Sequence, residues 1–103
     1  MKLPNKSTIL IIAPHPDDEV LGLGGAMKKF SDLGHDVIVL LVSGHLPPLY
    51  AEDVFVEHKK QALSAHKILG VKESIFLEIP ATYVRDESVA ELNGKIYTVL
   101  KNV

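Results

Sequence analysis

Residues 14–19, which read PHPDDE, place a histidine and three acids at the end of an apolar run. His15 and Asp18 are three positions apart, so in a turn that leads into a helix their side chains can converge on one ion. One imidazole nitrogen and one carboxylate oxygen are a common half of a zinc site. Asp17 lies between them and would point elsewhere, and a carboxylate beside such a site can act as a general base.

Two alternative roles for this segment do not involve a metal ion. The three acids suit the positive end of a helix dipole, so they could be capping residues only, although capping does not call for a histidine and two prolines. A phosphate-binding loop fits poorly, because its glycines should follow the strand directly and the acids would repel a pyrophosphate. The glycines inside the next helix are costly there, which suggests close packing on the sheet or backbone exposed to a ligand: Gly22, Gly24 and Gly25.

The elements that position this segment alternate between strand and helix. Three apolar runs are typical of strands buried in a parallel sheet: Thr8–Ala13, 36–43 and 74–79. Three segments with apolar residues at helical spacing follow them: 19–34, 52–70 and 86–103. The order predicts an α/β, Rossmann-like parallel sheet with right-handed crossovers, and it brings the residues after each strand to one edge.

The place of the first strand indicates an incomplete domain. A doubly wound order 3-2-1 leaves Thr8–Ala13, the most apolar strand, at an open edge of a small sheet. We therefore expect residues 1–103 to be the single N-terminal portion of a larger α/β domain, whose further strands lie beside this edge. The apolar edge also favours association, as a homo-oligomer or with a partner.

Composition excludes several classes of protein. The 103 residues are 47% hydrophobic and 23% charged, which is typical of one globular domain with a modest core. No cysteine is present, so any metal site rests on His, Asp and Glu. A net charge of −2 argues against nucleic acid as a partner. The apolar run 9–13 is too short for a signal peptide or a membrane span, so we expect a cytoplasmic protein.

Residues 13–25, APHPDDEVLGLGG, closely resemble the opening motif of the PIG-L or LmbE-like family of N-acetylglucosaminyl-phosphatidylinositol de-N-acetylases. The likeness continues through a strand ending in VSG, a helix closing on ILGV and the strand SIFLEI. The resemblance implies zinc as cofactor, a small N-acetylated amino sugar or conjugate as substrate, and amide hydrolysis that releases acetate. It also implies that His15 and Asp18 are zinc ligands and that Asp17 is the general base.

Three features depart from the family's pattern. The family's third zinc ligand is a histidine beyond the position where this chain stops, so the alternative is a non-catalytic or partner-completed fragment. Where the family often has GE after the second strand, this chain has Gly44 and His45. Where the next helix usually has an arginine and a glutamate, this chain has His58 or Lys59 and Gln61. The last two departures concern substrate specificity.

Three further residues are candidates for contact with substrate or for support of the metal ligands. Glu19 would orient a ligand or cap the helix. His45 follows the second strand at the same edge of the sheet, and His58 lies near the start of the next helix and could face the substrate. His35, at the opposite edge, is expected to be solvated, and His66 is expected to lie on a partly exposed helix face.

Overall fold

The computed structural model describes residues 5–16, 18–80 and 88–103, and it confirms an α/β fold. Within these residues the sheet has the order β1-β2-β3, and both pairs of neighbours are parallel. The strands are β1 (Thr8–Ala13), β2 (Asp36–Gly44) and β3 (Glu73–Pro80). The helices are α1 (Asp18–Asp32), α2 (Glu52–Leu69) and α3 (Val89–Asn102). The expected start of the last helix at 86–87 lies outside the described residues.

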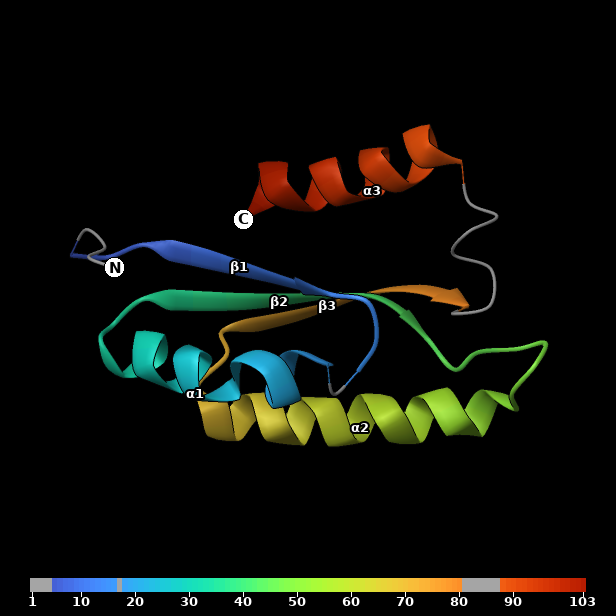
Figure 1. Ribbon diagram of the computed structural model, residues 1–103, viewed down its shortest axis with the longest axis horizontal. Coiled ribbons are helices and arrows are strands. Elements are labelled where there is room, and N and C mark those ends of the chain that lie inside the picture. Colours follow the sequence, from blue (N-terminus) through green and yellow to red (C-terminus); the bar gives the residue numbers. More distant parts are fainter. Residues whose placement is uncertain (1–4, 17, 81–87) are drawn as a thin grey trace.

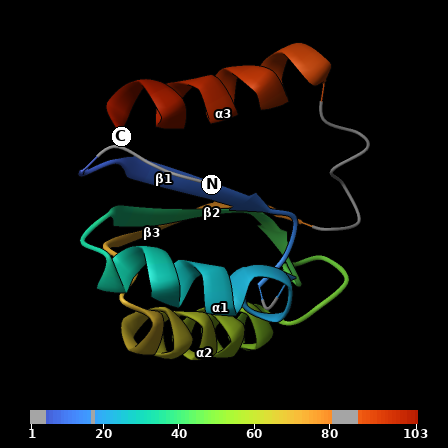
Figure 2. The same cartoon turned by 60° about the vertical axis from the view of Figure 1, so that its left-hand side comes forward.

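The elements form three layers, with α1 and α2 on one side of the sheet and α3 on the other (Figures 1 and 2). The core lies between the sheet and the first two helices, where it includes Ile11, Met27, Val39, Leu41 and Ala62. The strand β2 is the central one, and all but its first residue are buried. Alternate residues of a strand face opposite sides, so β2 is apolar on both.

The strand β1 lies at an edge of the sheet, as the sequence predicts. Ile11 pairs with Val39 of β2 and is buried, whereas the neighbouring Ile12 is 47% exposed. The expectation that β1 is buried on both faces is therefore wrong. On its second face β1 is covered less well, because α3 has no fully buried residue and so packs loosely. None of the described helices is both long and apolar enough to cross a membrane.

The glycines of α1 do not pack closely, which contradicts the first of the two roles suggested for them. A Cβ atom at Gly22 or Gly25 would meet nothing within 4 Å, and one at Gly24 would make only ordinary contacts at 3.9 Å. We expect Gly25→Ala to raise the free energy of unfolding by about 0.5–1 kcal/mol, because alanine loses less backbone entropy on entering a helix. Urea denaturation followed by circular dichroism measures this.

Gly70→Ala is the matched control for that prediction. Gly70 ends α2 in the left-handed region, with φ of 77°, and its N–H donates to the carbonyl oxygens of His66 and Lys67. A Cβ atom there would also collide with the side chain of Ser31. This substitution should therefore lower stability, and a loss of stability in Gly25→Ala as well would show that α1 needs glycine for a reason other than space.

Candidate metal site and histidine row

The segment after β1 is tied to the end of β2. The backbone oxygen of Pro14 accepts a hydrogen bond from the N–H of Ser43 at 2.8 Å and another from its hydroxyl at 2.7 Å. Ser43 is 2% exposed, so this double contact is sheltered from water. Sequence reasoning missed Ser43, whose only signal is a hydroxyl residue at the end of an apolar strand. The contact places His15 beside the carboxyl end of β2.

The side chains of His15 and Asp18 lie together at this edge. The Nδ1 atom of His15 is 3.1 Å from Oδ2 of Asp18, and the same oxygen accepts the backbone N–H of His15 at 3.1 Å. Both side chains are nearly half exposed, at 44% and 46%, so an ion can reach them. Two ligands of a tetrahedral zinc ion with bonds of about 2.0 Å are about 3.3 Å apart, so the pair fits half of such a site. Asp17 lies outside the described residues.

The described residues supply no complete metal site at this edge. In the ranges 5–16, 18–80 and 88–103, no three His, Asp or Glu side chains are placed to hold one ion. The ring of His45 stacks on that of His15 with centroids 6.5 Å apart and planes at 29°. The candidate donors that the described residues bring together here are therefore two, His15 and Asp18.

His45 is the centre of a row of rings that continues from His15 toward α2. Its ring centroid is 4.5 Å from that of Tyr50 and 5.2 Å from that of His58. We call His15, His45 and His58 the histidine row. These are the three histidines that the sequence predicted at this edge. His15 follows β1, His45 follows β2, and His58 lies near the start of α2. The ring nitrogen atoms of His45 and His58 can donate or accept hydrogen bonds near His15 and Asp18.

A groove of about 400 Å³ lies beside this row, between α2 and the end of β3. Glu78 lines it with φ of 60°, a left-handed conformation that is uncommon for glutamate, and β3 has a register shift in the same region. Its Oε1 atom is 3.6 Å from Nζ of Lys59, which also lies 4.9 Å from the ring centroid of Phe76. No pattern in the sequence indicates this conformation. Apolar and charged side chains both line the groove. The apolar ones are Leu46, Phe55, Val56 and Leu63, and the charged ones are Glu52, Lys59, Lys60 and Glu78.

Glu19 and His66 form a buried pair that joins α1 to α2. Oε1 of Glu19 is 2.7 Å from Nε2 of His66, and Nδ1 of His66 is 2.7 Å from the hydroxyl of Ser74 in β3. Glu19 is 1% exposed and His66 is 2% exposed. The expectation that His66 is partly exposed is therefore wrong. Its place on the helix could have shown this, because it shares the buried face of α2 with Phe55 and Ala62.

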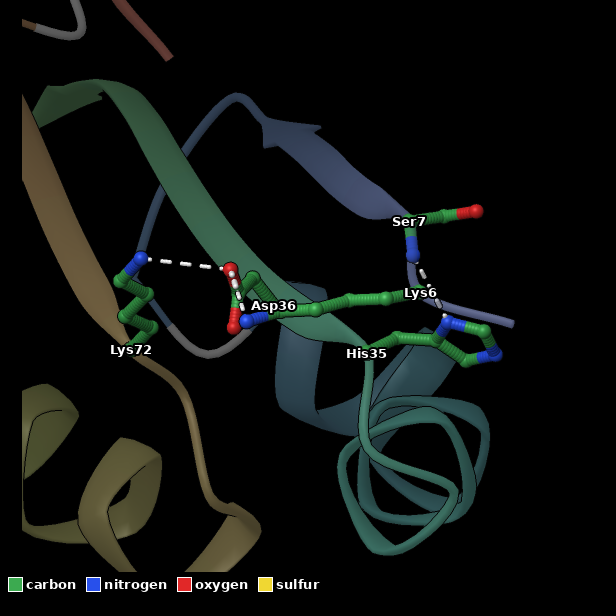
Figure 3. Close-up of polar contacts among 5 residues, drawn as sticks. All are labelled: Lys6, Ser7, His35, Asp36 and Lys72. Carbon is green, nitrogen blue, oxygen red and sulfur yellow. Dashed lines mark hydrogen bonds and ion pairs between the residues drawn. The ribbon is translucent and has the colours of Figure 1, made fainter. Parts of the chain in front are cut away.

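His35 lies at the opposite edge of the sheet, but it is not simply solvated as expected. Its ring is half-buried, and Nδ1 accepts a hydrogen bond from the backbone N–H of Ser7 at 3.1 Å (Figure 3). Beside it, Oδ2 of Asp36 is 3.2 Å from Nζ of Lys72 and 3.8 Å from Nζ of Lys6 (Figure 3). These contacts connect the starts of the three strands and are remote from His15.

The chain is similar in sequence and in fold to proteins named as deacetylases. The chain is 37% identical to a diacetylchitobiose deacetylase of Thermococcus kodakarensis over 90% of its own length and 36% of that protein's. It is 34% identical to a 1D-myo-inositol 2-acetamido-2-deoxy-alpha-D-glucopyranoside deacetylase of Kineococcus radiotolerans over 88% of its length and 28% of that protein's. The structure of N,N'-diacetylchitobiose deacetylase from Pyrococcus horikoshii superposes with a TM-score of 0.62 at 31% identity, covering 74% of this chain and 30% of the other.

The chain thus spans about a third of the length of the curated relatives that it matches. The match to the family described as GlcNAc-PI de-N-acetylase extends over residues 10–103, from the middle of β1 to the end of the chain. It includes the PHPDDE segment, the histidine row and the groove. This chain belongs to the GlcNAc-PI de-N-acetylase (PIG-L) family.

Proposed function

We propose that this chain is the N-terminal part of a zinc-dependent deacetylase that hydrolyses the N-acetyl group of an acetylated amino sugar. The observation that carries the proposal is the 3.1 Å approach of His15 Nδ1 and Asp18 Oδ2 at the carboxyl end of β1. Parallel α/β sheets bind their ligands at this edge. The names of the relatives support the reaction, since both curated proteins are deacetylases of acetylated sugars.

His15 and Asp18 would hold the zinc ion together with a third ligand from outside the described residues. When bound, zinc supplies a Lewis acid that polarises an amide carbonyl and activates water. Asp17, next to Asp18 in the chain, would take a proton from the attacking water at its carboxylate. The same carboxyl group would return a proton to the departing nitrogen. Water is thereby split between the products, which are acetate and the free amino sugar.

The histidine row and the groove would contact the rest of the substrate. His45 and His58 carry ring nitrogens that can hydrogen-bond sugar hydroxyls. The residues that follow them in the chain, Leu46 and Lys59, line the groove. The groove offers Phe55 and other apolar side chains next to lysine and glutamate. Sugar rings have apolar C–H faces and polar rims, so this mixture suits a sugar or its conjugate.

Because the third ligand lies outside the described residues, the first test is the zinc content of the longer protein to which this chain is proposed to belong, purified without chelator, in wild type, Asp18→Ala and Asp32→Ala. We expect close to one zinc ion per chain in the wild type and background zinc in Asp18→Ala, because that variant loses half of the described donor pair. Asp32, an exposed residue on the same helix that pairs with Lys28, is the matched control and should keep the zinc. Assays on N-acetylated amino sugars then test hydrolysis, and a wild type that binds no zinc contradicts the proposal for this chain.

A partner-completed site is the second candidate. It is favoured by the incomplete donor set among the described residues and by the open edge of β1, where Ile12 is half exposed. A second copy or a partner that pairs along β1 would then contribute the missing ligand. Light scattering on the zinc-loaded protein separates this candidate from the first one, because zinc binding depends on association only when a partner completes the site.

A further inference from the structure

We propose that His66 is a positioning residue for His15 and Asp18, the two candidate zinc ligands. It acts through Glu19 on the first turn of α1. This role rests on the function proposed above. Asp18 and Glu19 are the first two residues of α1, so contacts that fix the position of Glu19 also restrict the position of Asp18. Glu19 points into the protein against α2, whereas the side chain of Asp18 is 46% exposed at the edge of the sheet. The buried residue anchors the turn that carries the exposed one.

The ring of His66 is fixed from two sides. Nδ1 contacts the hydroxyl of Ser74 and Nε2 contacts Oε1 of Glu19, both at 2.7 Å. These contacts use both ring nitrogens, so they set the rotation of the ring. Through this ring β3, α2 and α1 are joined in one chain of hydrogen bonds. The rigid sheet thereby determines where the first turn of α1 lies.

The side chain of Glu19 has His66 as its single hydrogen-bond partner within the described residues. Its Oε2 atom is buried and has no hydrogen-bond partner within the described part of the chain. Its other oxygen is held by His66. Without His66 the carboxylate would be buried with no partner, and it would have to turn toward water. Such a movement would shift the first turn and separate Asp18 from His15, which are now 3.1 Å apart.

The serine, histidine and carboxylate of this network are the residue types of a hydrolase triad, but their placement favours positioning. His66 and Glu19 are almost completely buried, and Ser74 pairs with Val39 inside the sheet. In a nucleophilic triad the histidine that activates the serine must be reached by the substrate's leaving group, and His66 is too deeply buried for that. A polar network that is buried between layers instead fixes how those layers sit on one another.

The test compares zinc dissociation constants of the wild type with those of Ser74→Ala, His66→Ala and His66→Gln. We expect a rise of about tenfold or more in His66→Ala, since supporting residues of this kind typically change metal affinity by about 10- to 100-fold. His66→Gln keeps an amide donor for Glu19 and should recover part of the affinity. Ser74→Ala removes only the contact to Nδ1 and should show a smaller rise.

Ser31→Ala is the matched control. The hydroxyl of Ser31 donates to the backbone oxygen of Gly70 at 3.1 Å, so it also connects α1 to the α2 region, but from the far end of α1. This variant should keep the wild-type zinc affinity. If His66→Ala does not fold, His66→Gln and Ser74→Ala decide. Wild-type affinity in both of these, or an equal rise in Ser31→Ala, overturns the proposal.

A second measurement separates this inference from the proposed function. Nitrogen-15 spectra of the His15 imidazole in the metal-free protein report whether Nδ1 still contacts Asp18. We expect the His15 signals to shift in Ser74→Ala and His66→Gln and to stay unchanged in Ser31→Ala. A wild type that binds no zinc would contradict the proposed function alone. Unchanged His15 signals in both network variants would contradict the positioning role, whatever the zinc result.

Discussion

We expect His66→Ala to lower the free energy of unfolding by about 3 kcal/mol or more, because it leaves the buried carboxyl group of Glu19 without its hydrogen-bond partner. The Oε1 atom of Glu19 would lose its 2.7 Å contact at a position where the residue is 1% exposed. The Oε2 atom already has no partner within the described residues. Single domains are stable by about 5–15 kcal/mol, so this one substitution removes a large part of the total.

Urea denaturation of the wild type and of single variants measures this cost. Ser74→Ala is the control within the network, because it removes one neutral hydrogen bond and should cost only about 0.5–1.5 kcal/mol. The double variant Glu19→Met/His66→Leu replaces the pair by apolar side chains and should recover much of the loss. A loss of less than about 1 kcal/mol in His66→Ala would mean that Glu19 finds water or another partner there.

The sequence was sufficient for the elements and for their order in the sheet. Continuous apolar runs predicted β2 at 36–43 and β3 at 74–79, within one residue of the observed bounds. A glycine after an amphipathic run predicted the end of α2, and Gly70 has the left-handed conformation that such an end requires. These signals are local, because each depends on residues within one or two turns. Exposure of Ile12 was missed because it depends on which elements lie across the sheet from β1.

For the candidate site, too, some contacts could be predicted from the sequence and others could not. His15 and Asp18 could be predicted to meet because they are three residues apart, and His45 because ends of parallel strands share an edge. The contact between Glu19 and His66 joins residues 47 positions apart, and no local pattern encodes it. This histidine was expected on a partly exposed helix face, although its position on α2 is on the buried face. Residue type alone is a weak guide to burial when the partner is distant in the chain.

If the proposed deacetylase activity holds, Asp17→Asn is expected to lower its turnover number by about 10²- to 10⁴-fold while zinc affinity stays within a few-fold of the wild type. The amide has the shape of the carboxylate but cannot take a proton from water. Its neighbours His15 and Asp18 remain, so the described donor pair is intact. Steady-state kinetics on an N-acetylated amino sugar, together with the zinc content of the same sample, measure the two quantities.

Asp18→Asn is the matched comparison, because it makes the same chemical change one residue along the chain. There we expect zinc affinity to fall first, and activity to return in part when excess zinc is added, since an amide oxygen is a weaker ligand than a carboxylate. Excess zinc should not restore Asp17→Asn. Loss of zinc in Asp17→Asn would show that Asp17 is itself a ligand, and an unchanged turnover number would show that another group takes the proton. The pair of variants therefore separates holding the metal from moving the proton, two roles that adjacent carboxylates can share on one turn of chain.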